Sequence, residues 1–128
     1  MFATVAILLA LVVGTGAATG YAAARNQQRQ AQAVTATGGD PAKAQDHIQR
    51  FGCGGCHTVA GVPGASGLVG PPLQQIRDRV YVGSRTNTAD NLVEWITNPR
   101  AVNPNTPMPI TGISSSQARD IVAFLYAR

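Results

Sequence analysis

The pentapeptide Cys53-Gly54-Gly55-Cys56-His57 contains the residues of this chain that are best suited to chemistry. Two thiols separated by two residues can form thioether bonds with the two vinyl groups of one heme. The histidine that follows is then held where its imidazole can bind the iron as the proximal ligand. The pattern therefore predicts one covalently attached heme c, joined through Cys53 and Cys56, with His57 on the iron.

Three other interpretations of the cysteines remain open, each with less support. A plain disulfide between Cys53 and Cys56 would leave His57 unexplained. A thioredoxin-like dithiol needs a βαβ setting, and no strands are predicted around the motif. A structural zinc site needs four ligands, whereas the whole chain has two cysteines and two histidines, and His47 lies on the segment that leads into the cysteines.

An electron-transfer heme also needs a second axial ligand, usually methionine or histidine. Met1 lies at the far end of the chain, and His47 precedes Cys53 by only six residues, on the proximal side. Met108 remains, and prolines on both sides of it stiffen its loop. We therefore expect Met108 to be the second metal ligand beside His57; the alternative is a methionine that only fills a gap in a loop.

The rest of the domain is predicted to be all-α, with long loops around the heme. Asp40 and Pro41 can start a helix that Gly52 ends, a short amphipathic helix is expected at 73–80, and another runs from Asn87 or Thr88 to Asn98. A capping box at 114–117 starts the last helix. The segments 58–70 and 99–112 are rich in glycine or proline and predict loops, and no alternating run is long enough for a sheet.

Residues 1–24 predict a single transmembrane anchor. No charged side chain occurs from Phe2 to Ala24, and about 20 apolar residues span a bilayer as a helix. A cleaved signal peptide is the alternative, with 22–24 as its cleavage site. Arg25 and Arg29 would favour a cytoplasmic location for the residues that follow the anchor. Heme attachment requires the periplasm, and on the strength of the heme motif we expect the domain to be periplasmic.

The chain therefore divides into an anchor at 1–24, a polar linker at 25–39 and one domain at 40–128. The linker could extend the anchor helix by one or two turns before Gly38 and Gly39. The domain has few aromatic residues, so a bound heme would complete its small core.

Charged residues make up 12% of the chain, and from residue 40 onward there are eight basic and six acidic side chains. No basic stripe is present, so nucleic-acid binding is not expected.

These motifs resemble class I cytochrome c over residues 40–128. Gly70-Pro71-Pro72-Leu73 is similar to the Gly-Pro-x-Leu of that family, and Met108 follows Pro99 by nine residues, as the family methionine does. The resemblance implies that the Pro71 carbonyl accepts a hydrogen bond from His57, that Leu73 packs on the heme and that Trp95 lies at the heme crevice. It also implies that the terminal helices cross through Ala44, Ile48 and Phe124.

By the same analogy, Arg79, Tyr81 and Arg85 are candidates for binding the heme propionates. The resemblance implies a single-electron carrier of a respiratory chain rather than an enzyme, with no small-molecule substrate. It would be a subunit of, or a donor to, a terminal oxidase, anchored in the bacterial inner membrane with the heme domain in the periplasm. The alternatives are a soluble periplasmic cytochrome serving a dehydrogenase, a heme sensor or peroxidase-like protein with a displaceable Met108, and a heme-free module.

Overall fold

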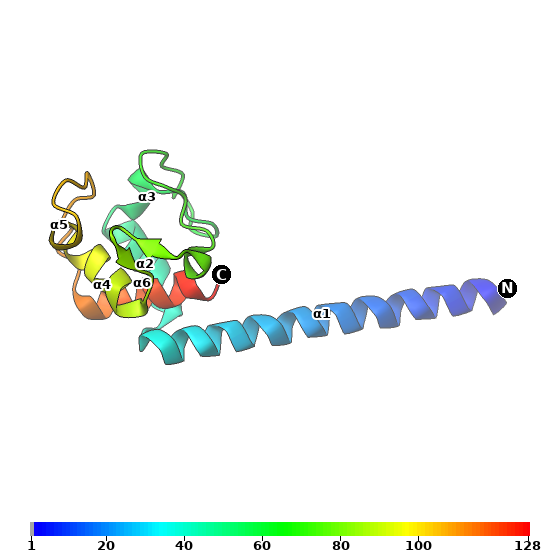
Figure 1. Ribbon diagram of the computed structural model, residues 1–128. Coiled ribbons are helices and arrows are strands. Elements are labelled where there is room, and N and C mark those ends of the chain that lie inside the picture. The colour runs from blue at the N-terminus through cyan, green and yellow to red at the C-terminus, as the bar shows by residue number, and fades with distance from the viewer. Residues whose placement is uncertain (1) are drawn as a thin grey trace.

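A computed structural model describes residues 2–128, with side chains from Thr4 onward; Met1 lies outside the described residues. The described chain is mostly helical, as expected, and one long helix extends away from a small domain (Figure 1). The elements, in chain order, are α1 (Phe2–Thr37), the 3₁₀ turn η1 (Pro41–Lys43), α2 (Ala44–Arg50), α3 (Cys53–Cys56), the 3₁₀ turn η2 (Ile76–Asp78), β1 (Tyr81–Val82), β2 (Arg85–Thr86), α4 (Ala89–Thr97), α5 (Pro99–Val102) and α6 (Ser115–Tyr126).

Helix α6 forms the centre of the domain, and α1, α2 and α4 pack against it. It begins at the predicted capping box: Ser114 Oγ accepts from the Gln117 amide at 3.3 Å, and Gln117 Oε1 accepts from the Ser114 amide at 3.1 Å. Its first turns are polar and partly exposed, whereas every residue from Ile121 to Tyr126 is buried because other elements pack around this half of the helix. Its buried residues are Ala118, Ile121, Val122, Ala123, Phe124, Leu125 and Tyr126.

The predicted crossing of the terminal helices is present. Asp40 starts this part of the fold by accepting a hydrogen bond from the Ala42 amide, with Pro41 next to it. Ala44 is fully buried, Ile48 is 1% exposed and Phe124 is 5% exposed, and all three belong to one hydrophobic core. A small side chain at Ala44 lets α2 approach α6 closely.

The structure contradicts the predicted helix at 73–80. Only the turn η2 is helical, because Gln75 adopts a left-handed conformation with φ at 53° and Arg79 is extended. The side chain of Asn87 donates to the carbonyl oxygens of Ile76 at 2.6 Å and Arg79 at 2.9 Å. These long-range bonds satisfy carbonyl groups that a helix would otherwise use. A two-residue hairpin, β1 and β2, follows where no strand was expected.

The polar segment 25–39 also differs from our expectation. Helix α1 continues without a break to Thr37, so thirteen residues of the predicted linker, 25–37, are helical rather than one or two turns. Residues 21–37 contain no glycine or proline, and Gln, Arg and Ala are good helix formers. The last turn is also held by the domain, since Ala33 is 1% exposed and Thr37 is 2% exposed.

Candidate heme-binding site

The two cysteines lie on the single turn of α3. Gly52 precedes them with φ at 71°, a left-handed conformation that separates α2 from α3. Cys53 and Cys56 are three positions apart on this turn, which places their side chains on one face. Both are free thiols, so the structure contains no disulfide between them. Burial raises the pKa of the Cys53 thiol, and the nearby Cys56 also acts to raise it.

The imidazole of His57 is fixed by the segment that follows the CxxCH motif. His57 Nδ1 lies 2.7 Å from the Pro71 carbonyl oxygen, the hydrogen bond that the family resemblance implied. A carbonyl oxygen can only accept, so Nδ1 carries a proton, and in the neutral imidazole the free lone pair is then on Nε2. Gly70 lies flat against the ring, where a Cβ would come within 2.3 Å of His57 Cε1. The geometry therefore leaves Nε2 able to bind a metal.

A ladder of hydrogen bonds joins residues 66–73 to the motif. The amides of Gly67, Gly70 and Leu73 donate to the carbonyls of Gly54, Cys56 and Thr58 at 2.9, 2.8 and 2.9 Å. Thr58 Oγ1 also donates to the Gly67 carbonyl at 3.0 Å. Gly67 lies too close for a side chain, because a Cβ there would be 2.4 Å from the Gly55 oxygen. The ladder is what brings Pro71 to His57.

Met108 lies in the loop after α5 and is partly buried. Its amide donates to Thr106 Oγ1 at 3.2 Å, and the Thr106 amide donates to the Asn103 carbonyl at 3.1 Å. Ser84 in the β1–β2 turn donates to the Val102 carbonyl at 2.8 Å, which ties the end of α5 to the hairpin. α5 and α3 stand on the same side of the domain, away from α1 (Figure 1).

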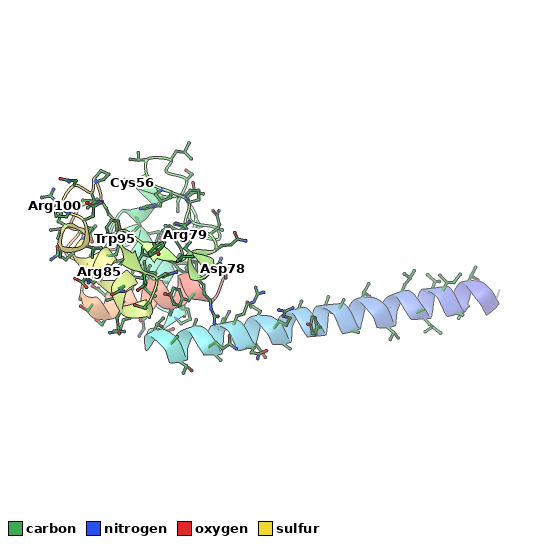
Figure 2. All side chains as sticks on the ribbon, viewed as in Figure 1. Cys56, Asp78, Arg79, Arg85, Trp95 and Arg100 are labelled. Atoms are coloured by element: carbon green, nitrogen blue, oxygen red, sulfur yellow. The ribbon has the colours of Figure 1, made fainter. Side chains whose placement is uncertain are left out.

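Leu73 and Trp95 are partly buried and pack against the edge of the core, as Cys53 does. The Trp95 ring lies against the hairpin turn, where a Cβ on Gly83 would be 2.8 Å from Trp95 Cζ3. Figure 2 shows Cys56 and Arg100 on the two lobes that point away from α1, with Trp95 below Cys56 in this view, on the side nearer to α1.

The three candidates for the propionates differ in their contacts. Arg79 donates to the carbonyl oxygens of Pro72 and Gln74, so its guanidinium lies near the Pro71 segment and has no carboxylate partner. Tyr81 is 64% exposed. Arg85 forms an ion pair with Glu94 on α4, which already uses its charge. Arg79 is therefore the better placed of the two arginines.

The sequence reasoning did not single out Asn87 as a site residue. Its amide group holds both ends of η2, and its Oδ1 accepts from the Tyr126 hydroxyl at 2.9 Å. Asn87 thereby links α6 to the segment that carries Arg79. An asparagine before a helix is also a common N-cap, and Thr88 fills that role here, so the sequence had offered no separate signal for this bond.

The residues present fit a heme. A large apolar group would cover apolar side chains that the protein alone leaves exposed. Beyond residue 40, the exposed large hydrophobic residues lie in the loops and the β1–β2 hairpin that carry the predicted site, and they are Leu68, Val69, Val80, Tyr81 and Ile110. The free thiols of Cys53 and Cys56 are the groups that form thioether bonds with a heme, and the imidazole Nε2 of His57 and the thioether of Met108 are groups that can bind its iron.

The comparison with protein families agrees with this fit. The family model described as Cytochrome c matches residues 41–127, which is more than half of the chain. The chain therefore belongs to the cytochrome c family, whose members bind covalent heme c, and it has the two cysteines at the required spacing. A cytochrome c domain supports the role of a c-type heme electron carrier, and it fits that role better than the role of an enzyme. No solved structure matches the chain significantly.

Proposed function

We propose that this protein is a membrane-tethered monoheme cytochrome c that carries single electrons in a respiratory chain, as a subunit of or donor to a terminal oxidase. The domain would lie on the periplasmic side of a bacterial inner membrane. The proposed tether is supported by the surface of α1. Its apolar residues from Val5 to Val13 are exposed, and no part of the described chain covers them.

His57 and Met108 are the proposed iron ligands. When bound, heme supplies reversible one-electron exchange between Fe(II) and Fe(III). The Pro71 carbonyl holds His57 in the tautomer that presents Nε2, and hydrogen bonds of this kind orient a ligand and raise its basicity. With His57 and Met108 both bound to it, the iron would have a raised reduction potential and no site left for a substrate. These ligands therefore favour a carrier over a peroxidase-like enzyme.

Leu73 and Trp95 are proposed to exclude water from the crevice, and Arg79 and Tyr81 to bind the propionates. Leu73 and Trp95 are joined to the hydrophobic core. The Arg79 guanidinium is fixed by two carbonyl oxygens, which leaves further N–H groups for a carboxylate, since arginine has five. These roles predict that the charge of Arg79 stabilises binding of the heme propionates. They also predict that Leu73 and Trp95, by excluding water, favour the reduced heme, which carries less charge.

Residues 1–24 are proposed to anchor the protein. The described residues contain one helix that is long and apolar enough to cross a bilayer, with a mean hydropathy of 1.9 in its most apolar window. An N-terminal signal sequence would have the same properties, so the tether rests on retention of this segment. A tether raises the local concentration of the domain near membrane partners, so weak docking suffices. That agrees with a single lysine, which supports little long-range steering.

Replacement of Met108 tests the ligand assignment. We expect Met108→Ala to lower the midpoint potential and change the visible spectrum of the full-length protein, because the sulfur ligand would be lost. Asn105→Ala is the control, since Asn105 lies in the same loop and its side chain is exposed. Unchanged spectrum and potential in Met108→Ala would exclude Met108 as a ligand and would reopen the heme-sensor and peroxidase-like alternatives.

Fractionation of cells tests the tether and the partner. We expect a peroxide–luminol stain after denaturing electrophoresis to mark a band of the full-length protein in the membrane fraction, and only there. A stained soluble protein that has lost residues 1–24 would indicate the cleaved periplasmic form, and an unstained band would indicate a heme-free module. Co-purification with oxidase subunits in mild detergent would support the fixed-subunit form of the proposal.

A further inference from the structure

The polar half of α1 ends in a set of contacts that a flexible tether would not need. On α1, Ala33 and Thr37 lie four residues apart on one face, and both are almost fully buried in a domain whose centre is α6. Arg119 Nη1 of α6 donates to the Thr37 carbonyl at 3.0 Å. Arg77 also contacts Gln32 Oε1 at 3.4 Å. The end of α1 is therefore part of the domain's packing.

The two glycines after α1 would be the obvious hinge, but the structure restrains them. Gly39 is pressed against α6, where a Cβ would be 2.1 Å from the Arg119 oxygen. The Gly38 amide donates to the Val34 carbonyl at 2.8 Å, and the Gly39 amide donates to Thr37 Oγ1 at 3.2 Å. The next amide, Asp40, donates to Asp120 Oδ1 at 2.7 Å. The chain is thus bonded on both sides of the hinge.

Between the apolar segment and these contacts, residues 25–31 of α1 are exposed. A hollow of about 680 Å³ lies where Asn26, Arg29 and Gln30 face the end of α6 at Phe124 and Ala127. We call the seven residues 25–31 of α1 the neck. At 1.5 Å per residue the neck is about 10 Å long. It has no glycine or proline, so the helix passes from the apolar segment to the domain as one rod.

We infer that α1 is a rigid mount: residues 32–40 fix the heme domain in one orientation on a continuous helix that rises from the membrane. This inference rests on the proposed anchor and deepens it. The side of the domain that carries α3 and α5 faces away from α1 (Figure 1), so the mount leaves that side open. The partner that fits is a second membrane-bound redox protein, whose electron-transfer site stands more than about 10 Å above the bilayer.

Polarised absorption of the full-length protein in oriented phospholipid multilayers tests the mount. A rigid mount holds the heme plane at one tilt to the membrane, so we expect heme absorption to depend on the angle of the incident light. Ala33→Glu puts a charge into the buried contact and should reduce this dependence at least twofold. Val34→Glu is the matched control, because it adds the same charge one residue later, at a position that is 42% exposed.

A second pair of variants keeps every docking contact. Replacing residues 26–30 by Gly-Ser-Gly-Ser-Gly should abolish the angular dependence, whereas five alanines in the same place should preserve it, because alanine keeps the helix. Wild-type protein that stays in the membrane with its heme but shows no angular dependence would overturn the rigid mount, as would full dependence in the Gly-Ser variant. Loss of the anchor itself would be seen separately, as protein in the soluble fraction.

Discussion

At the scale of single residues, the site depends on how closely the 66–73 segment approaches His57. Pro71 contributes a main-chain carbonyl rather than its side chain, and Gly70 contributes the space that a side chain would fill. Both roles belong to the backbone. A substitution at Gly70 therefore tests the site more directly than one at Pro71, because every residue at position 71 keeps a carbonyl oxygen.

Gly70→Ala is expected to destabilise the holoprotein by about 1–3 kcal/mol, the usual cost of forcing extra atoms into a packed region. The added methyl would overlap the His57 ring and disturb its bond to Pro71. Denaturant unfolding and the visible spectrum measure the effect. Gly55→Ala is the control, since a Cβ at Gly55 meets nothing within 4 Å. Equal stability of the two variants would contradict the close approach.

At the scale of elements, α6 organises the domain because it contacts α1, α2 and α4 and, through Tyr126 and Asn87, the η2 turn. Substitutions at the start and at the end of α6 are therefore expected to affect different parts of the domain. Its first turn depends on local capping, whereas its last turn holds the η2 segment that carries Arg79. One prediction concerns each end.

Ser114→Ala should lower the free energy of unfolding by about 1 kcal/mol, because it removes the N-cap oxygen that accepts from the Gln117 amide. Thermal or urea unfolding measures this loss. Ser115→Ala provides the matched control, because the Ser115 side chain has no hydrogen bond in the described structure. If both variants lose the same stability, the capping box does not stabilise α6.

The Tyr126 phenol should make stability depend on pH at the alkaline end. Burial raises the pKa of Tyr126 above its usual value of 10.0, although the charge of Arg77 acts to lower it. The neutral phenol is favoured in the folded state, so its contribution is complete below about pH 10 and is lost as the pH rises through the higher folded pKa.

Tyr126→Phe cannot ionise and lacks the bond to Asn87. It should be about 1 kcal/mol less stable than wild type at pH 8, the usual contribution of one hydrogen bond. Near pH 11 the difference should shrink, because only the wild type then loses stability through ionisation of the phenol. Urea unfolding at the two pH values, followed by circular dichroism, measures both differences. A difference that stays constant would contradict this role of Tyr126.

At the scale of the whole molecule, α1 decides how the domain meets its partners. The helix has 36 residues and is about 54 Å long, well beyond the roughly 30 Å of a bilayer core. A fixed subunit would hold α1 against neighbouring helices and prevent its rotation. A mobile tethered carrier would rotate freely about the membrane normal.

Insertions in the neck distinguish these two arrangements. Two alanines inserted between Gln27 and Gln28 turn the domain by about 200°, and four turn it by about 400°, which is a net 40°. In a fixed subunit, the two-residue insertion should slow electron transfer to the proposed oxidase partner more than the four-residue insertion does. The rates are measured in native membranes. A rate that decreases steadily with the number of inserted residues, whatever the angle of rotation, would indicate a mobile carrier.

The sequence by itself determined the parts of this protein that depend on local chemistry. The CxxCH motif, the capping box at Ser114 and the break at Asn98 and Pro99 act through residues close together in the chain. The spacing of Gly70, Pro71 and Met108 matched that of cytochrome c, so the family and the Pro71 hydrogen bond to His57 could be predicted without a structure.

Only the tertiary structure decided what depends on residues far apart. The 73–80 segment has an amphipathic pattern, but Asn87 captures the carbonyls of Ile76 and Arg79, so only one 3₁₀ turn forms there. Glu94 pairs with Arg85, which leaves Arg79 as the better placed arginine. The polar stretch after Ala24 consists of good helix formers, and the domain fixes the end of its helix by burying Ala33 and Thr37 and through the bond from Arg119 to the Thr37 carbonyl. Propensity is a weak prior, which contacts across the fold reinforce at 25–37 and override at 73–80.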